Sequence, residues 1–265
     1  MLGFTPSGTV ALITDFGVTD PFVGIMKAVM LREHPALTLV DVTHGVSPQD
    51  VALADLWLSA SYGWFAAGAV HLCVVDPGVG SERAAVVTRS NGHLFVAPDN
   101  GILSGILRAD TAAETRRIDV AELGLSVPSR TFHGRDVFAP IAARLASAKL
   151  AFEHVGPPWQ PRVEPERGAS RSGAALEGEV VAVDHFGNLI TNLPERWLEP
   201  AFTVVEICGR NLRRVTTYSD AEQGECAALL SSFDTLEIAL RNGNAAVELG
   251  AGRGTRVRVR TEERG

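Results

Sequence analysis

The residues of this 265-residue chain best suited to chemistry are an aspartate, an arginine and a histidine. Asp76 directly follows the apolar run 70–75, and Arg83 comes a few residues later; His133 stands in a second polar segment, TFHGRD. A carboxylate can fix the tautomer of an imidazole, and the imidazole can take a proton near neutral pH. An arginine nearby would keep Asp76 ionised and hold an oxygen ligand. The three residue types together predict a metal-free site that activates a water molecule.

Asp76 is one of three aspartates that stand at or near the ends of apolar, strand-like runs. Asp15 follows the run 9–14, and Asp41 comes at the end of the run 37–42. In an open α/β sheet, ligands bind outside the carboxyl ends of the strands. The pattern therefore predicts three carboxylates along one edge of a sheet. The alternative is that each aspartate only caps a turn.

The elements that would position these residues alternate between strands and helices. Such alternation predicts an α/β domain with a mainly parallel sheet between helices. Asn91-Gly92 is the signal of a type I′ hairpin turn between two further strands. The expected strands are 9–14, 37–42, 70–75, 84–89 and 93–97, and the expected helices are 22–33, 49–62, 102–108 and 137–148.

The pattern changes beyond a segment rich in Pro, Gly, Arg and Ser. Short alternating runs separated by turn residues follow it, which is typical of a small antiparallel β domain, barrel-like or sandwich-like. We expect an α/β N-terminal domain over 1–156, a linker over 157–174 and a smaller, barrel-like, all-β C-terminal domain over 175–265.

Composition argues against several classes of partner. The net charge of −7 disfavours nucleic acid and anionic membranes, both of which bind basic surfaces. The three cysteines are far apart in the sequence, which predicts reduced thiols rather than a disulfide framework. No signal-peptide pattern is visible, and no apolar run approaches the roughly 20 residues needed to cross a bilayer. We expect a cytoplasmic protein.

Familiar cofactor motifs are absent from the sequence. Gly78-Val79-Gly80 does not continue as a dinucleotide-binding loop, because Arg83 stands where the third glycine would fall. There is no phosphate-binding G-x-x-x-x-G-K-[ST] loop and no G-x-S-x-G nucleophile motif. A metal site remains a weaker alternative, because the Asp and His residues are scattered and no H-E-x-x-H or paired cysteines occur.

A further polar segment, 183–192 (VDHFGNLITN), lies between apolar runs of the C-terminal part. Asn188 has an amide that can donate and accept one hydrogen bond each with an adenine-like edge. The alternative is an ordinary loop with an Asx-type turn.

Seven segments in order closely resemble the S-adenosyl-L-methionine (SAM) hydroxide adenosyltransferases. This family, also called SAM hydrolases, is related to the SAM-dependent fluorinase and chlorinase. The resemblance covers nearly the whole chain. The segments are 14–24, 40–50, 74–83, 97–103, 131–140, 183–192 and 231–240.

The resemblance implies that water or hydroxide displaces methionine at C5′ of SAM, which gives adenosine and L-methionine. The family's water-holding set falls on Asp76, Arg83 and His133. The leaving group is a neutral thioether, so no general acid is needed, and no cofactor is implied. The task of such a site is to position a desolvated water in line.

The resemblance also assigns binding roles in both domains. Asp15 would bind the ribose hydroxyls, Asp184 the methionine ammonium and Asn188 the purine. Ser232 would hold the methionine carboxylate. Glu237 and the backbone of Leu240 would line the adenine and amino-acid end.

Related enzymes are trimers whose site lies between the first domain of one subunit and the second domain of its neighbour. The resemblance therefore implies a homotrimer with its site at the subunit interface, SAM as its small-molecule substrate and adenosine as a product.

Four positions distinguish this sequence from its relatives. The halogenases have a tyrosine where Asp76 stands, and the fluorinase has a serine where Gly134 stands. Ser231 replaces a common asparagine and Asp234 a common glycine, which leaves the shape of the loop near Ser232 open. Asp76 with His133 favours hydroxide as nucleophile, whereas Gly134 alone would not exclude chloride. The alternatives are a SAM-dependent chlorinase and a non-catalytic adenosine- or SAM-binding protein.

Overall fold

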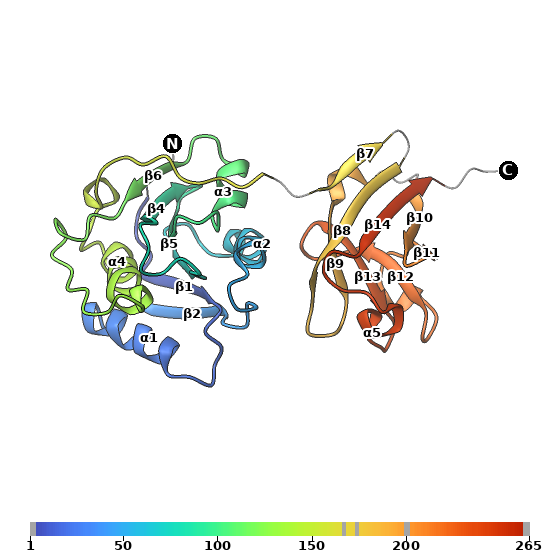
Figure 1. Cartoon of the computed structure of the whole chain (residues 1–265), viewed down its shortest axis with the longest axis horizontal. Coiled ribbons are helices and arrows are strands. Elements are labelled where there is room, and N and C mark those ends of the chain that lie inside the picture. Colours follow the sequence, from blue (N-terminus) through green and yellow to red (C-terminus); the bar gives the residue numbers. More distant parts are fainter. Residues whose placement is uncertain (1–3, 166–167, 173–174, 199–201, 262–265) are drawn as a thin grey trace. The chain divides into compact units, whose positions relative to one another are not determined.

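The computed structural model describes residues 4–165, 168–172, 175–198 and 202–261 (Figure 1). The chain divides into two compact units, Met1–Pro165 and Glu166–Gly265, so the division falls inside the predicted linker 157–174. The part of that linker before Pro165 is bound to the first unit: Trp159 donates to the Asp99 carboxylate (2.7 Å), and the Glu164 N–H donates to a serine hydroxyl of the same unit (2.8 Å).

The first unit is built on one sheet of six strands. Its strands are β1 (Thr9–Thr14), β2 (Thr38–Thr43), β3 (Val70–Val74), β4 (Ala85–Ser90), β5 (His93–Pro98) and β6 (Glu114–Arg117). Their order across the sheet is β2-β1-β3-β5-β4-β6. The adjacent strands β2, β1, β3 and β5 are parallel to one another, whereas β4 is antiparallel to both of its neighbours, β5 and β6. The prediction of a mainly parallel sheet is confirmed.

Helices cover both faces of this sheet (Figure 1). They are α1 (Phe22–Glu33), α2 (Val51–Ser61), α3 (Ser104–Ala109) and α4 (Ala139–Ala146), with 3₁₀ turns at Tyr62–Trp64 and Phe152–His154. Successive side chains of a strand point to opposite faces. Accordingly, Leu12 of β1 packs in one core with Met26 of α1, and Ile13 packs in a second core with Leu58 of α2.

The predicted hairpin is present between β4 and β5. Asn91 and Gly92 have φ angles of 48° and 78°, as the type I′ turn requires. This turn reverses the chain, so β4 runs against the parallel part of the sheet.

The second unit is a nearly closed antiparallel barrel. Its strands are β7 (Ser170–Ser172), β8 (Ala175–Val183), β9 (Leu189–Pro194), β10 (Phe202–Ile207), β11 (Arg210–Arg213), β12 (Cys226–Leu230), β13 (Thr235–Leu240) and β14 (Arg256–Thr261). They follow the order β11-β10-β14-β8-β9-β13-β12, and β7 pairs with β8. A bridge between Arg214 and Ala228 brings the chain after β11 to β12. The barrel also carries α5 (Ala245–Leu249) and 3₁₀ turns at Glu195–Trp197 and Tyr218–Asp220.

Within the described ranges, no helix is long and apolar enough to span a membrane. All three cysteines are free thiols.

Candidate active site

Asp76, Arg83 and His133 meet where β3 ends. The Arg83 guanidinium donates from Nε to both Asp76 oxygens, at 2.9 Å to Oδ1 and 3.1 Å to Oδ2, and its Nη2 also contacts Oδ2. The same Nη2 lies 2.9 Å from Nδ1 of His133. The side chains of Asp76 and Arg83 are only 6% and 11% exposed, so water screens their attraction little. The structure thus brings all three sequence-predicted residues together.

Arg83 stands between the other two, which corrects the expectation of a direct Asp–His pair. In the described parts of the chain, no hydrogen bond joins Asp76 to His133. A guanidinium has hydrogens to donate and no lone pair to offer. We therefore assign Nδ1 of His133 as the acceptor from Arg83. In the neutral ring the hydrogen then sits on Nε2, which is left as a donor.

The surroundings keep this imidazole neutral. Burial lowers the pKa of His133 below its ordinary 6.5, and the positive charge of Arg83 lowers it further. Asp76 and Asp136 act in the opposite direction, but the net shift of this pKa is downward. Protonation would place a second hydrogen on Nδ1, facing the arginine.

The turn between Asp76 and Arg83 needs glycine at one of its two glycine positions. Gly80 has φ +81°, and a Cβ there would lie 2.8 Å from the carbonyl oxygen of Arg130. Gly78 has ordinary backbone geometry. The side chain of Asn100 donates to the Val75 carbonyl (2.9 Å) and so ties the end of β3 to the loop that follows β5.

A π-helical turn over Gly134–Phe138 carries His133 at its entry. Such turns occur frequently at functional sites. Here the turn precedes α4, so the helix expected over 137–148 begins only at Ala139. The buried ring of Phe138 lies 5.3 Å from Cζ of Arg83 and supports the guanidinium by a cation–π contact. Nothing in the local periodicity distinguishes this turn from the start of an α-helix.

Asp15 projects from the same edge of the sheet as Asp76. β1 and β3 are adjacent and parallel, with Thr14 opposite Val74, so the residues that follow them are close. Oδ2 of Asp15 accepts the Gln49 N–H at 2.8 Å. Asp15 is thereby held with the rest of its carboxylate available to a ligand.

Asp41 does not belong to this edge. It lies within β2, where the strand continues to Thr43, and its carboxylate binds Nζ of Lys27 (2.5 Å). Burial works to raise the pKa of Asp41, but Lys27 and His44 outweigh it and lower that pKa. The expectation of three strand-end carboxylates is therefore wrong for the middle one.

An aromatic cluster lines the buried Gly134. The rings of Phe16, Phe22 and Phe132 pack edge to face, with centroids 5.4–6.1 Å apart. A Cβ on Gly134 would come within 3.2 Å of both Met26 Sδ and Phe132 Cε2. A larger residue there would have to displace its neighbours, and the wall next to His133 is apolar.

In the second unit, Asp184 and Asn188 form one hydrogen-bonded loop. Oδ1 of Asp184 accepts the N–H groups of Phe186 (2.9 Å) and Asn188 (2.8 Å), and Oδ2 accepts from the Asn188 amide (2.9 Å). Gly187 has φ +86°, and Asn244 packs where its Cβ would be. The Asx-type turn is therefore present, and it orients the amide and carboxylate that the resemblance assigns to substrate.

Glu237 of β13 lies close to this loop. It is 4% exposed and accepts the hydroxyl hydrogen of Tyr218 at 2.7 Å. Burial raises the pKa of Glu237, as does the negative charge of Asp184, while the hydrogen bond from Tyr218 lowers it. Tyr218 was not among the predicted site residues. Its half-exposed ring, anchored by the hydroxyl, presents an aromatic surface next to the polar groups.

The remaining two predicted residues flank β13. Ser232 is exposed in the turn before the strand, and Leu240 is its last residue. Asp234 in that turn has φ +57°, a conformation that glycine adopts without strain. Ser231 closes the turn through its hydroxyl, which accepts the Phe233 N–H at 3.1 Å. The turn is thus formed without the residues that are common in relatives.

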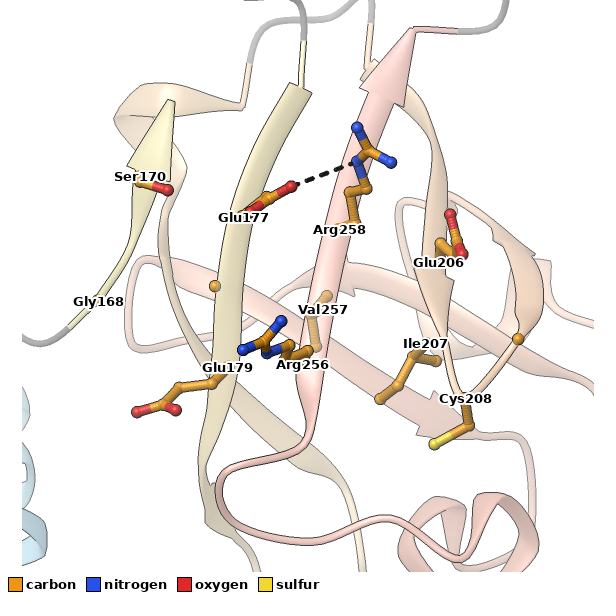
Figure 2. A pocket seen from close by; sticks show the side chains of 12 residues that line it. Gly168, Ser170, Glu177, Glu179, Glu206, Ile207, Cys208, Arg256, Val257 and Arg258 are labelled. Carbon is orange, nitrogen blue, oxygen red and sulfur yellow. Dashed lines mark ion pairs between the residues drawn. The ribbon is translucent and has the colours of Figure 1, made fainter. Parts of the chain in front are cut away.

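A hollow of about 560 Å³ elsewhere in the second unit contains none of the predicted residues (Figure 2). Its charged lining alternates across neighbouring strands, with Glu177 3.6 Å from Arg258 and Glu179 opposite Arg256. Glu206 adds a third carboxylate to these two pairs, and the hollow is an open, charged face of the barrel. The described residues also include no group of three or more His, Cys, Asp or Glu placed to hold a metal ion.

Comparison with known families decides the assignment. Residues 10–156 match the model of the SAM hydroxide adenosyltransferase N-terminal domain, and residues 178–258 match that of the C-terminal domain. The chain belongs to the SAM hydroxide adenosyltransferase family.

Named relatives resemble the chain over nearly its full length. The (R)-S-adenosyl-L-methionine hydrolase of Thermus thermophilus is 38% identical over 261 residues, which cover 94% of this chain and 98% of that protein. The enzyme of the same name from Salinispora tropica is 36% identical over 271 residues (96% and 98%). The fluorinase of Nocardia brasiliensis is 26% identical over 292 residues (95% and 96%).

The fold also matches a solved structure. An uncharacterised conserved protein from Thermotoga maritima superposes with a TM-score of 0.88 at 33% identity, covering 94% of this chain and 99% of that one. Both units of the chain therefore have counterparts in that structure.

Proposed function

We propose that the protein hydrolyses SAM to adenosine and L-methionine. The observation that carries this proposal is the hydrogen-bonded set Asp76–Arg83–His133 at the end of β3. Relatives that share 36–38% of their residues with this chain are named SAM hydrolases, whereas the fluorinases share less.

In the proposed reaction, the set holds one water in line with the C5′–S bond. Nε2–H of His133 donates to the water oxygen. Asp76 keeps lone pairs beyond those that Arg83 occupies and accepts a hydrogen of the same water. As the oxygen bonds to C5′, the C–S electron pair leaves with sulfur as a neutral thioether. The displaced proton passes to Asp76 and then to solvent.

Binding is divided among the other predicted residues. We assign the ribose hydroxyls to Asp15, the methionine ammonium to Asp184 and the purine to Asn188. Ser232 and the backbone of Leu240 take the methionine carboxylate and the amino-acid end. These are short polar groups held in place by turns, which suits orientation of a small ligand.

Glu237 lines the adenine end together with Tyr218. The hydroxyl of Tyr218 is held by the Glu237 carboxylate, so the exposed face of the tyrosine ring is oriented for stacking on a purine.

Three features of the working enzyme belong to the same proposal. No cofactor takes part and the reaction is independent of metal ions, because the thioether leaves the sulfonium as a neutral molecule without acid or Lewis-acid help. The enzyme is a homotrimer with its site at the subunit interface. It acts in the cytoplasm, in keeping with three free thiols and a net charge of −7.

The test is an incubation of the purified protein with SAM in ¹⁸O-labelled water. We expect adenosine and methionine in equal amounts, with the heavy oxygen in the 5′-hydroxyl of adenosine. The Asp76→Ala variant serves as the matched blank, and a chelator is added in one arm. Intact SAM after prolonged incubation would identify a binding protein without turnover and contradict the proposal.

A second arm with high chloride addresses the distant halogenase relatives. Formation of 5′-chloro-5′-deoxyadenosine in place of adenosine would assign a chlorinase. We expect adenosine at every chloride concentration, because Asp76 and His133 provide an acceptor and a donor for water.

A further inference from the structure

His44 is a buried histidine that the proposed reaction does not use. It is 5% exposed and lies behind the strand end that carries Asp15. Its Nδ1 is 2.8 Å from the Thr14 hydroxyl. Its Nε2 is 3.0 Å from Oδ1 of Asp41, a close approach that does not reach hydrogen-bond geometry.

The protons of this group follow from the contacts of Thr14. Its hydroxyl oxygen accepts the Phe16 N–H, so we assign the hydroxyl hydrogen to Nδ1 of His44. In the neutral ring Nε2 then carries the hydrogen and faces the Asp41 carboxylate. The order of carboxylate, imidazole and hydroxyl is that of a nucleophile relay. Thr14 is 0% exposed, however, so its oxygen does not reach a substrate. The hydroxyl has a different task.

That task is to hold the turn containing Asp15. The Thr14 hydroxyl oxygen accepts the N–H of Phe16 at 3.2 Å. At the far end of the turn, the N–H of Gly17 donates to the backbone carbonyl of His44 at 2.8 Å. His44 therefore fastens the turn twice, through its ring at Thr14 and through its carbonyl at Gly17. Asp15 lies between the two attachments.

We propose that His44 is a positioning residue for ribose binding: with Thr14, it fixes the turn that aims the Asp15 carboxylate at the ribose hydroxyls. This inference rests on the proposed function, in which Asp15 binds ribose. It assigns to His44 a place in substrate affinity rather than in the bond-breaking step. Asp41 and Lys27 support the ring from the outer side.

The test compares two ligands on matched variants. Thr14→Val keeps the β-branched shape and loses the hydroxyl, whereas Thr14→Ser keeps the hydroxyl. We measure Kd for adenosine and for 2′,3′-dideoxyadenosine, which lacks the groups that Asp15 would bind. Thr14→Val should weaken adenosine about tenfold and dideoxyadenosine less than about twofold, on the scale of a lost hydrogen bond to a charged group. Thr14→Ser should restore the wild-type ratio.

Kinetics supply the second readout. Thr14→Val should raise KM for SAM with little change in kcat. His44→Gln, which reaches Asp41 but not Thr14, should show the same selective loss and provides a second variant if the first does not fold.

Two failures are distinguishable. Equal weakening of both ligands in the folded variants, or of neither, would overturn the positioning role while leaving the hydrolase intact. Wild-type protein that binds neither adenosine nor SAM would overturn the proposed function, and the inference with it.

Discussion

Nη2 of Arg83 donates a hydrogen bond to Nδ1 of His133 across 2.9 Å. This contact fixes the imidazole in the form that donates from Nε2. The same guanidinium holds both oxygens of Asp76, so one arginine sets the orientation of the other two groups. In the proposed reaction, this arrangement makes His133 the donor to the water and leaves the proton-accepting role to Asp76.

Substitutions at His133 distinguish the contributions of its two ring nitrogens to turnover. Glutamine places an amide near the position of Nε2 and keeps a donor for the water. Asparagine places its amide near Nδ1 and keeps only the contact with Arg83. We expect His133→Gln to retain more turnover than His133→Asn, and His133→Ala to lose about 10²–10³ in kcat. Steady-state adenosine formation measures this order, and the reverse order would contradict the assigned tautomer.

The ability of the Arg83 guanidinium to bind two partners at once is predicted to matter more for turnover than its positive charge. Lysine has a single ammonium and would not span Asp76 and His133 together. Arg83→Lys should lower kcat by roughly 10–100-fold, with KM for SAM changed by less than about threefold. Arg89→Lys is the matched control, because Arg89 pairs with two carboxylates of its own away from the site. Full activity of Arg83→Lys would show that charge alone suffices.

The pH profile of kcat should reflect the lowered pKa of His133. Burial and Arg83 favour the neutral ring, so the active form persists below the ordinary histidine pKa of 6.5. We expect kcat to stay level from pH 8 to pH 6.5 and to fall only in more acidic solution, where His133 gains a proton. Stopped assays in buffers of constant ionic strength measure the profile. A decline of kcat centred above pH 6.5 would show that the pKa of His133 is raised rather than lowered.

A pair of buried histidines outside the site predicts that the fold is sensitive to acid. His71 and His93 are buried side by side, with Nε2 and Nδ1 3.2 Å apart. Burial lowers the pKa of His71 from 6.5 to about 3, and burial also lowers the pKa of His93. Both folded-state pKa values lie below the value of about 6.5 in the unfolded chain. The contribution of the two neutral histidines to the free energy of unfolding is therefore fully present above pH 6.5. It is lost as the pH falls toward 3, because the unfolded chain then binds protons that the folded chain excludes.

The expected slope in that window is up to about 1.4 kcal/mol of unfolding free energy per pH unit for His71. Urea unfolding of the wild type and of the His71→Phe/His93→Phe double variant between pH 7 and pH 4 measures it. The double variant should show a shallower decline. An equal decline of the free energy of unfolding with pH in the two proteins would show that these histidines do not cause the acid sensitivity.

The hydrogen bond from Tyr218 to the buried Glu237 gives a test in the second unit. Tyr218→Phe keeps the ring and leaves the buried carboxylate without its donor, which should cost roughly 1–3 kcal/mol of stability unless Glu237 takes up a proton. Because burial raises the pKa of Glu237, the loss should shrink as the pH falls and the carboxyl takes up a proton. Thermal midpoints of wild type and variant at pH 7 and pH 5 measure this difference. An equal loss at both pH values would contradict it.

The sequence by itself determined the elements and the fold class. Apolar periodicity is a local property, so the bounds of β1, α1 and the hairpin at Asn91-Gly92 follow from neighbouring residues. Strand adjacency then placed Asp15 and Asp76 at one edge. The residue types nominated Arg83 and His133 as partners of Asp76, and the family resemblance implied the same set.

Only the tertiary structure decided how these groups are connected. Arg83 and His133 are 50 residues apart, and which atom of one meets which atom of the other depends on a π-turn that leaves no local signal. The same holds for the ion pair of Asp41 with Lys27 and for the contact of Tyr218 with Glu237. Side-chain direction and hydrogen-bond pairing are set by packing between distant segments, and a one-dimensional pattern does not contain that information.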